Sequence, residues 1–184
     1  TFFDVFNARA YTNSDGNVAW AGPWTEVGDD ANPTSGVISI AVDGDSIPGQ
    51  TYALQTLSTA SAQRAADLSG YTNATLWFDY RRTGLEAGEF VNINVSSNGG
   101  GTFTQIGQIG GATNDGSYFS QSYNISAYAT TGTVIRFTGS AGRDTTTDIV
   151  WLDNIRIDES AANATNALPD PPGLLDDYTL PPGT

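Results

Sequence analysis

The alternation of apolar and polar residues between positions 74 and 109 constrains the fold more than any other feature of the chain. Leu76, Phe78 and Tyr80, for example, fall on one side of an extended backbone, with polar or amphipathic residues between them. A period of two is typical of strands that bury one face. The stretches with this pattern are residues 74–82, 90–96 and 103–109. The turn residues Asn98 to Gly101 separate the last two and predict a β-hairpin.

Shorter strand-like stretches occur along most of the chain. They are residues 2–6, 20–26, 36–40, 52–57, 133–137 and 149–157. The only candidate helix is the Ala-rich stretch 59–67, and it is short. Eight or nine short strands separated by Gly- and Asn-rich turns predict an all-β protein, a two-sheet antiparallel β-sandwich of jelly-roll type.

The composition changes after residue 158. Residues 1–158 are predicted to form the jelly-roll domain, and residues 159–184 an extended Pro-rich C-terminal tail. The tail also carries large apolar residues besides Leu168, and four of them are close together: Leu174, Leu175, Tyr178 and Leu180. We expect these side chains to pack either on their own domain or on a neighbouring copy of the chain.

Four residue types are absent, and their absence limits the chemistry. The chain has no Cys, His, Met or Lys. Thiolate and imidazole metal sites are therefore excluded, and any metal must be a hard cation held by oxygen, of which calcium is the first candidate. Most nucleophiles and general bases are missing too, and only carboxylate pairs such as Glu86 and Glu89 remain. We predict that the protein is not an enzyme.

The net charge of −13 restricts the partners. Nucleic acids and anionic membrane surfaces attract basic proteins, so neither is expected here. No apolar run approaches the ~18 residues of a membrane span, and membrane insertion is not expected. The chain begins at Thr1 in a strand-like stretch, which we interpret as a processed or cut end of a secreted, cell-surface protein.

Residues 4–157 resemble the jelly-roll modules of bacterial surface and secreted proteins, in the superfamily of MAM domains and carbohydrate-binding modules. The residues that carry the resemblance are Asp4-Val5-Phe6, 13–16, Trp20, Trp24-Thr25-Glu26, 64–70, 78–82, 95–100, Asn124-Ile125-Ser126 and 151–155. Such modules occur on glycosidases, proteases and adhesins, so the resemblance specifies a fold more closely than a function.

The resemblance implies a calcium site. In related jelly rolls, a carboxylate of the last strand binds calcium. Further ligands come from the first strand and from a loop that corresponds here to residues 26–30. The matching positions here are Asp4, Glu26, Asp29, Asp30 and Asp153. Six to eight oxygen ligands suit calcium, and clustered acids repel one another without a cation. The alternative is that these acids cap turns and face solvent.

One open face could bind a sugar. The residues whose strand phase would place them there are Trp77, Asp79, Arg81, Asn92, Asn94 and Arg136. Aromatic rings stack on sugars, while amides, carboxylates and guanidinium groups hydrogen-bond hydroxyls. The alternative is that Trp77 belongs to a buried surface, since Trp is mostly buried in proteins.

Two segments could link copies of the chain. The N-terminal stretch contains Phe2, Phe3 and Phe6, and the tail contains the four apolar residues named above. A strand added to the sheet edge of a neighbour gains main-chain hydrogen bonds, and such head-to-tail contacts build filaments. We favour a calcium-stabilised subunit of an extracellular filament or sheath. The alternative is a carbohydrate-binding module of a larger secreted protein, which would bind cell-surface or polysaccharide glycans.

Overall fold

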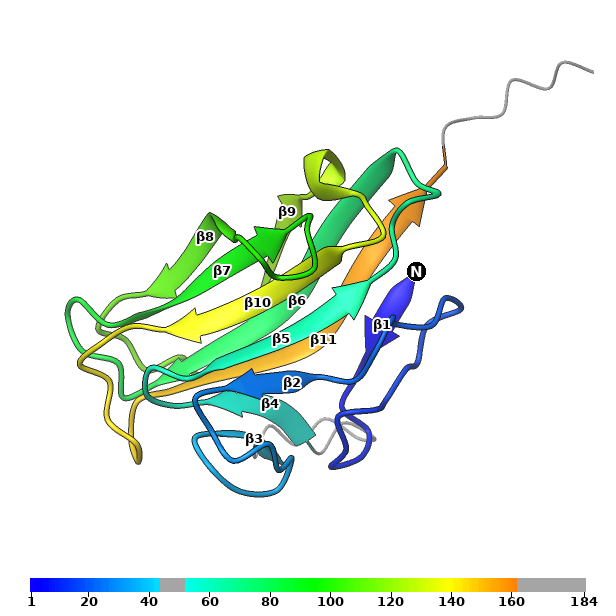
Figure 1. Ribbon diagram of the computed structural model, residues 1–184. Coiled ribbons are helices and arrows are strands. Elements are labelled where there is room, and N and C mark those ends of the chain that lie inside the picture. The colour runs from blue at the N-terminus through cyan, green and yellow to red at the C-terminus, as the bar shows by residue number, and fades with distance from the viewer. Residues whose placement is uncertain (44–51, 162–184) are drawn as a thin grey trace, which may run out of the picture.

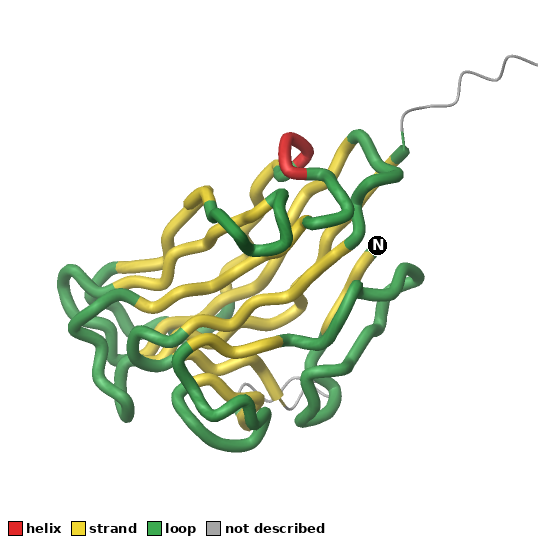
Figure 2. Tube along the Cα trace, viewed as in Figure 1, coloured by secondary structure: helices red, strands yellow, loops and turns green. Residues whose placement is uncertain are grey.

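The computed structural model describes residues 1–43 and 52–161. Two antiparallel sheets pack face to face (Figures 1 and 2), as the alternating pattern predicted. The described part contains one short 3-10 turn, η1 (Ser126–Tyr128), and no α-helix. The prediction of an all-β jelly-roll sandwich is confirmed.

The six-stranded sheet has the order β3-β4-β11-β6-β9, and β1 pairs with residues 155–157 of β11. Its strands are β1 (Phe2–Asp4), β3 (Ile38–Val42), β4 (Tyr52–Thr56), β6 (Asn73–Thr83), β9 (Phe119–Asn124) and β11 (Ile149–Ser160). The five-stranded sheet has the order β2-β5-β10-β7-β8. Its strands are β2 (Thr25–Val27), β5 (Ser61–Ala66), β7 (Phe90–Ser96), β8 (Thr104–Gly110) and β10 (Thr133–Gly139).

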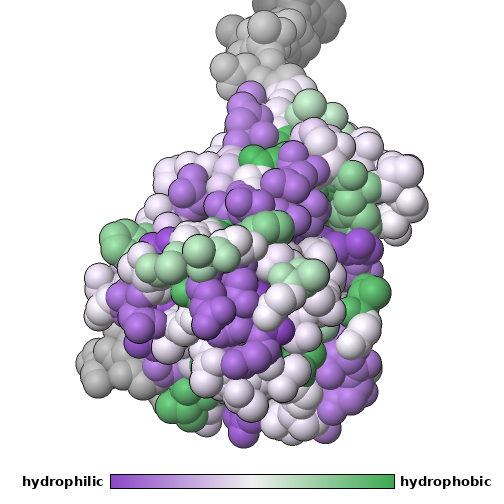
Figure 3. Space-filling view, turned by 90° about the vertical axis from the view of Figure 1, so that its left-hand side faces the viewer, coloured by the Kyte–Doolittle hydropathy of each residue, from purple (hydrophilic) through white to green (hydrophobic). Residues whose placement is uncertain are grey.

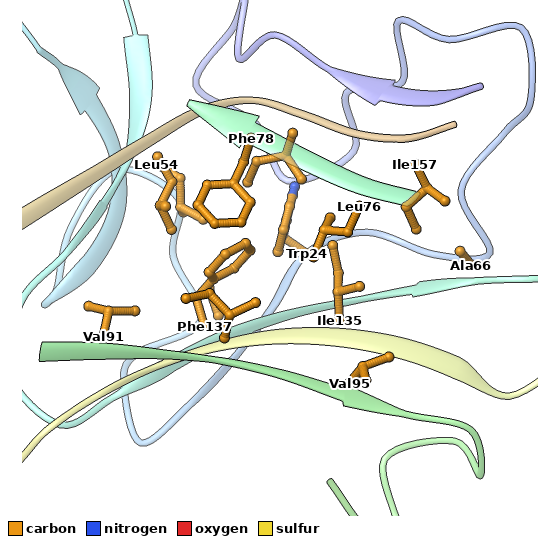
Figure 4. Close-up of a cluster of buried hydrophobic side chains, with 14 of the residues drawn as sticks. Trp24, Leu54, Ala66, Leu76, Phe78, Val91, Val95, Ile135, Phe137 and Ile157 are labelled. Atoms are coloured by element: carbon orange, nitrogen blue, oxygen red, sulfur yellow. The ribbon is translucent and has the colours of Figure 1, made fainter. Parts of the chain in front are cut away.

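The core fills the space between the sheets, and its side chains come from alternate positions of the strands (Figure 4). Phe78 of β6 meets Phe137 of β10 edge to face, with ring centroids 5.2 Å apart. Both side chains are at most 1% exposed, and so are Leu76 and Ile93. Burial of each such side chain stabilises the fold by about 1.5–3 kcal/mol, so the period-two pattern is the main source of stability.

Three local predictions need correction. Residues 61–66 form strand β5 and not a helix, because pairing with β2 and β10 on both sides outweighs the helix preference of Ala. Strand β9, whose sequence is largely polar, was not predicted. Strand β11 continues to Ser160, so the first two residues of the predicted tail belong to the last strand. The remaining tail residues, from 162, lie outside the described residues.

Candidate functional site

The six predicted ligand-binding residues do not share one face. Trp77, Asp79 and Arg81 lie on β6, in the six-stranded sheet, and their side chains point away from the core. Asn92 and Asn94 of β7, and Arg136 of β10, belong to the five-stranded sheet. The prediction of a single open face is therefore wrong, because strand phase fixes the side of a strand but not the sheet that the strand joins.

The outer face of the five-stranded sheet carries two rows of paired side chains, which we call rungs. The first rung is Thr25, Gln63, Arg136, Asn94 and Gln105. The second rung is Val27, Ser61, Thr138, Asn92 and Gln108. The residues between the rungs, such as Phe137 and Ile93, point inward and are buried. Each rung crosses five strands, a distance of about 19 Å at the usual strand spacing.

Hydrogen bonds hold the polar side chains of the rungs in place. Arg136 Nε donates to Gln63 Oε1 at 2.8 Å, within the first rung. Gln108 Nε2 donates to Asn92 Oδ1 at 3.1 Å, within the second. Asn94 Nδ2 reaches the hydroxyl of Thr138 at 3.4 Å and joins the two rungs. These amides lie side by side with donors and acceptors in fixed positions, as recognition of a hydroxyl-rich ligand requires.

The rungs carry almost no charge. Strands β5, β7, β8 and β10 contain no Asp or Glu, although the chain has 20 acidic residues. Their two charged residues are Arg64, which points into the core and is 2% exposed, and Arg136. The face therefore presents one positive charge on a protein whose net charge is −13.

Arg136 lies over the ring of Phe103, the residue directly before β8. Its guanidinium carbon is 3.5 Å from the centroid of Phe103, a cation–π contact. Burial lowers the pKa of Arg136 from its usual value, and the side chain still carries its charge at neutral pH. Within the described residues, only Nε has a hydrogen-bond partner. The two terminal nitrogens can therefore donate to a pair of hydroxyl groups.

On the opposite sheet, Trp77 and Asp79 line a small cavity, while Arg81 belongs to a different group of residues. Arg81 donates to the carbonyl oxygen of Asp43 and lies over the rings of Tyr118 and Trp151, at 5.4 and 5.8 Å. The cavity around Trp77 has a volume of about 150 Å³. Arg81 does not line it.

Three of the five predicted calcium ligands come together. The carboxylates of Glu26, Asp29 and Asp30, here called the three-acid cluster, offer oxygens within 4.8 Å of one another. Burial first, and then the charges of Asp29 and Asp30, raise the pKa of Glu26. Backbone N–H groups already donate to all three acids, from Ala31 to Glu26 and from Ile38 to Asp29 at 2.6 Å, and from Asn32 to Asp30 at 2.9 Å. The cluster could hold a hard cation, because its oxygens are the type that calcium prefers.

The other two predicted ligands lie elsewhere. Asp4 is fully buried and accepts hydrogen bonds from Arg64 Nη1 at 2.6 Å and from Trp24 Nε1 at 2.9 Å. Its counter-charge is thus a guanidinium group. Asp153 lies on β11, is 2% exposed and accepts a bond from the N–H of Asn154. The role of Arg64 was missed in the sequence, although its spacing from Ala62 and Ala66 indicated an inward position.

The predicted assembly residues divide into two groups. Phe2 and Phe6 are at most 1% exposed in their own core, while Phe3 is half-buried. Strand β1 pairs with β11 of the same chain, so donating it to a neighbour would remove two aromatic side chains from the core. Leu174, Leu175, Tyr178 and Leu180 lie outside the described residues.

The described surface is polar. Its exposed large hydrophobic side chains are Val27, Val42 and Phe119, which lie on three different strands, β2, β3 and β9. Figure 3 shows one end of the sandwich, where hydrophilic and hydrophobic residues are interspersed without a broad apolar area. No helix in the described ranges is long and apolar enough to cross a bilayer.

Comparisons with known proteins agree with the fold. No family model matches the chain, and no curated protein matches it. Among solved structures, TmCBM61 in complex with β-1,4-galactotriose has a TM-score of 0.51 at 15% identity, over 76% of this chain and 90% of that one. The K2 cleaved adhesin domain of Lys-gingipain has a TM-score of 0.52 at 15% identity, over 73% and 89% of the two chains.

A third match is to part of a larger protein. The CBM22-1–GH10 modules of a Clostridium thermocellum xylanase, complexed with xylohexaose, have a TM-score of 0.55 at 12% identity, over 90% of this chain and 29% of that one. The MAM part of the resemblance stays a prediction. At these identities the likeness concerns the fold alone, and the chain shares its jelly-roll fold with carbohydrate-binding modules and adhesin domains.

Proposed function

We propose that this chain is a non-catalytic, extracellular carbohydrate-binding module whose ligand is a neutral polysaccharide lying across the two rungs. The observation that carries the proposal is the pair of acid-free rungs of hydrogen-bonded amides on an open sheet face. Two structural neighbours with TM-scores above 0.5 are complexes with galactotriose and xylohexaose, which are short chains of neutral sugars.

The ligand class follows from charge and shape. An anionic polysaccharide would be repelled by a protein of net charge −13 and would find one cation, Arg136, on the face. A neutral chain avoids this repulsion, and its hydroxyls both donate to and accept from amides such as Asn94 and Gln108. The rungs are longer than one sugar ring, which favours a chain over a monosaccharide.

We do not expect the rungs to hydrolyse a bound polysaccharide. Glycoside hydrolysis uses two carboxylates on opposite sides of the scissile bond. The rungs contain no carboxylate, so they can hold a polysaccharide but lack the groups that would cleave it.

Calcium binding stays a prediction and is placed at the three-acid cluster. Bound there, the ion would join β2, which carries Glu26, to the loop that follows it, which carries Asp29 and Asp30. Head-to-tail assembly depends on tail residues outside the described ranges. Light scattering of the full chain tests it, and a monomer at all concentrations would contradict it.

The rungs are tested by retention on immobilised neutral polysaccharides, including galactan, xylan and mannan. Asn94→Ala should weaken retention about tenfold, since each lost hydrogen bond contributes about 0.5–1.5 kcal/mol and Asn94 contacts both rungs. Gln55→Ala is the matched control, because it removes a half-buried amide from the other sheet. Equal retention by the wild type, Asn94→Ala and Gln55→Ala would contradict the proposal, and so would no retention on any polysaccharide.

A further inference from the structure

The cavity around Trp77 lies on the side of the sandwich opposite the rungs, on the outer face of the six-stranded sheet. Its volume is about 150 Å³. The residues that line it are Trp77, Phe78, Asp79, Ser120, Asn154 and Arg156. They come from β6, β9 and β11, so the cavity is built on three adjacent strands and not on a loop.

A β-bulge in β11 opens this cavity. Asp153 pairs with Asp79, and Arg156 pairs with Trp77, so two residues of β11 face one residue of β6. The extra residue is Asn154, whose φ of 50° lies in the left-handed region that Asn tolerates. Bulges re-aim side chains and are common beside functional sites. Here the bulge turns the Asn154 amide onto the outer face of β6.

The polar wall of the cavity is held rigidly. Asn154 Nδ2 donates to Asp79 Oδ2 at 2.9 Å, and the hydroxyl of Ser120 donates to Asp79 Oδ1. A carboxylate has about four acceptor positions, and these two bonds use one on each oxygen. Asp79 can therefore still accept hydrogen bonds from two neighbouring hydroxyls of a ligand.

The apolar wall is Trp77, with Arg156 beside it. Trp77 is the most exposed tryptophan, because Trp20, Trp24 and Trp151 are at most 8% exposed. The guanidinium carbon of Arg156 is 5.2 Å from the Trp77 ring centroid, and Arg156 Nε donates to Asp158 at 3.1 Å. Arg156 also lines the cavity, so its terminal nitrogens are available to donate to a ligand there.

We infer that this cavity binds a single neutral pyranose ring, such as the end or a branch of a glycan. The inference takes its ligand class from the proposed function but concerns a different face. A cavity of about 150 Å³ holds one six-membered ring. Asp79 and Arg156 carry opposite charges on the two sides of the cavity, so an uncharged ligand is favoured. Because the rungs and this cavity face away from each other, one module would join two glycan chains.

Tryptophan fluorescence tests the cavity directly. The full chain is titrated with methyl glycosides of galactose, glucose, mannose and xylose, and acrylamide quenching is followed. One of these glycosides should protect the half-buried Trp77 from quenching. Asp79→Asn should weaken that response about tenfold, because it removes the carboxylate charge and replaces one acceptor oxygen by an NH2 group, so a ligand hydroxyl that donates to this oxygen loses its acceptor.

Control variants separate this inference from the proposed function. Asn94→Ala should leave the response to the methyl glycoside unchanged, and Asp79→Asn should leave retention on polysaccharide unchanged. Trp77→Phe should remove the fluorescence response, and its melting temperature checks folding. The inference is overturned if no glycoside alters quenching, or if the response survives in Trp77→Phe. Loss of the response in Asn94→Ala would assign the monosaccharide to the rungs and also overturn it.

Discussion

Replacing Arg64 by Met should destabilise the protein strongly. Arg64 is buried in β5 and forms an ion pair with Asp4 of β1, so it joins the two sheets. It also donates to the carbonyl oxygens of Gly22 and Asn13, and it lies 4.7 Å from the Trp20 ring centroid. Met keeps much of the apolar volume but leaves the Asp4 carboxylate buried without a counter-charge.

The expected loss is about 3–5 kcal/mol, the usual result of removing one partner of a buried ion pair. For a chain of 184 residues, each kcal/mol lowers the melting temperature by about 2–4 °C, so we expect a decrease of about 6–20 °C. Urea unfolding followed by tryptophan fluorescence gives the free energy, and calorimetry gives the melting temperature. The loss should shrink in acid, because burial raises the pKa of Asp4 and a protonated Asp4 needs no counter-charge.

Two further variants test whether the unpaired charge of Asp4 causes the loss of stability in Arg64→Met. Asp158→Asn breaks the Arg156–Asp158 pair, whose side chains are 38% and 44% exposed, and should cost less than about 1 kcal/mol. The double variant Asp4→Leu with Arg64→Met should recover part of the stability, since no charge is left unpaired. A loss below about 1 kcal/mol for Arg64→Met alone would refute the reasoning, and so would a double variant less stable than Arg64→Met.

Two other predictions concern stability. The pKa of Glu26 is higher in the folded state than in the unfolded state, so between these two pKa values the folded state binds more protons. Without metal, the free energy of unfolding should therefore fall as the pH rises through this window. Calcium should remove that fall and raise the melting temperature at neutral pH, and Glu26→Gln should abolish this effect of calcium. If calcium leaves the melting temperature of the wild type unchanged, there is no calcium site at the three-acid cluster. Gly139→Ala should cost about 1–3 kcal/mol, because the new methyl group would overlap the carbonyl oxygen of Ser58. Gly70→Ala has open space around it and should unfold like the wild type in the same urea titration, and equal stability of both variants would count against the packing argument.

The strands could be predicted where one face is buried, and less well elsewhere. The alternation around Phe78 and Ile93 is produced by the core and is visible in the sequence. Strand β9 lies at a sheet edge, with half-buried or exposed residues throughout, and has no such pattern. In β5, the inward residues Ala62 and Ala66 are small and also suit a helix, and only pairing with distant strands makes this segment extended.

The candidate sites depend on pairing between strands that are far apart in the chain, and the sequence does not show which strands pair. Trp77 and Asn94 both point away from the core and lie on consecutive strands, β6 and β7. These strands nevertheless belong to different sheets. Asp4 pairs with Arg64 across 60 residues, and the sequence does not show this pairing, so the resemblance alone made the Asp4 carboxylate a predicted metal ligand. The three-acid cluster was predictable because Glu26, Asp29 and Asp30 are close in the chain.

In the proposed function, the acid-free rungs would separate solubility from recognition. A protein with net charge −13 stays dispersed through repulsion between its acids, and this repulsion weakens as ionic strength rises. At about 1 M salt, the screening length is only about 3 Å. A face that recognises its ligand through amides and one guanidinium group loses little by such screening. Adhesion through the rungs should therefore be as strong in brine as in fresh water, while attachment through surface charge would fail there.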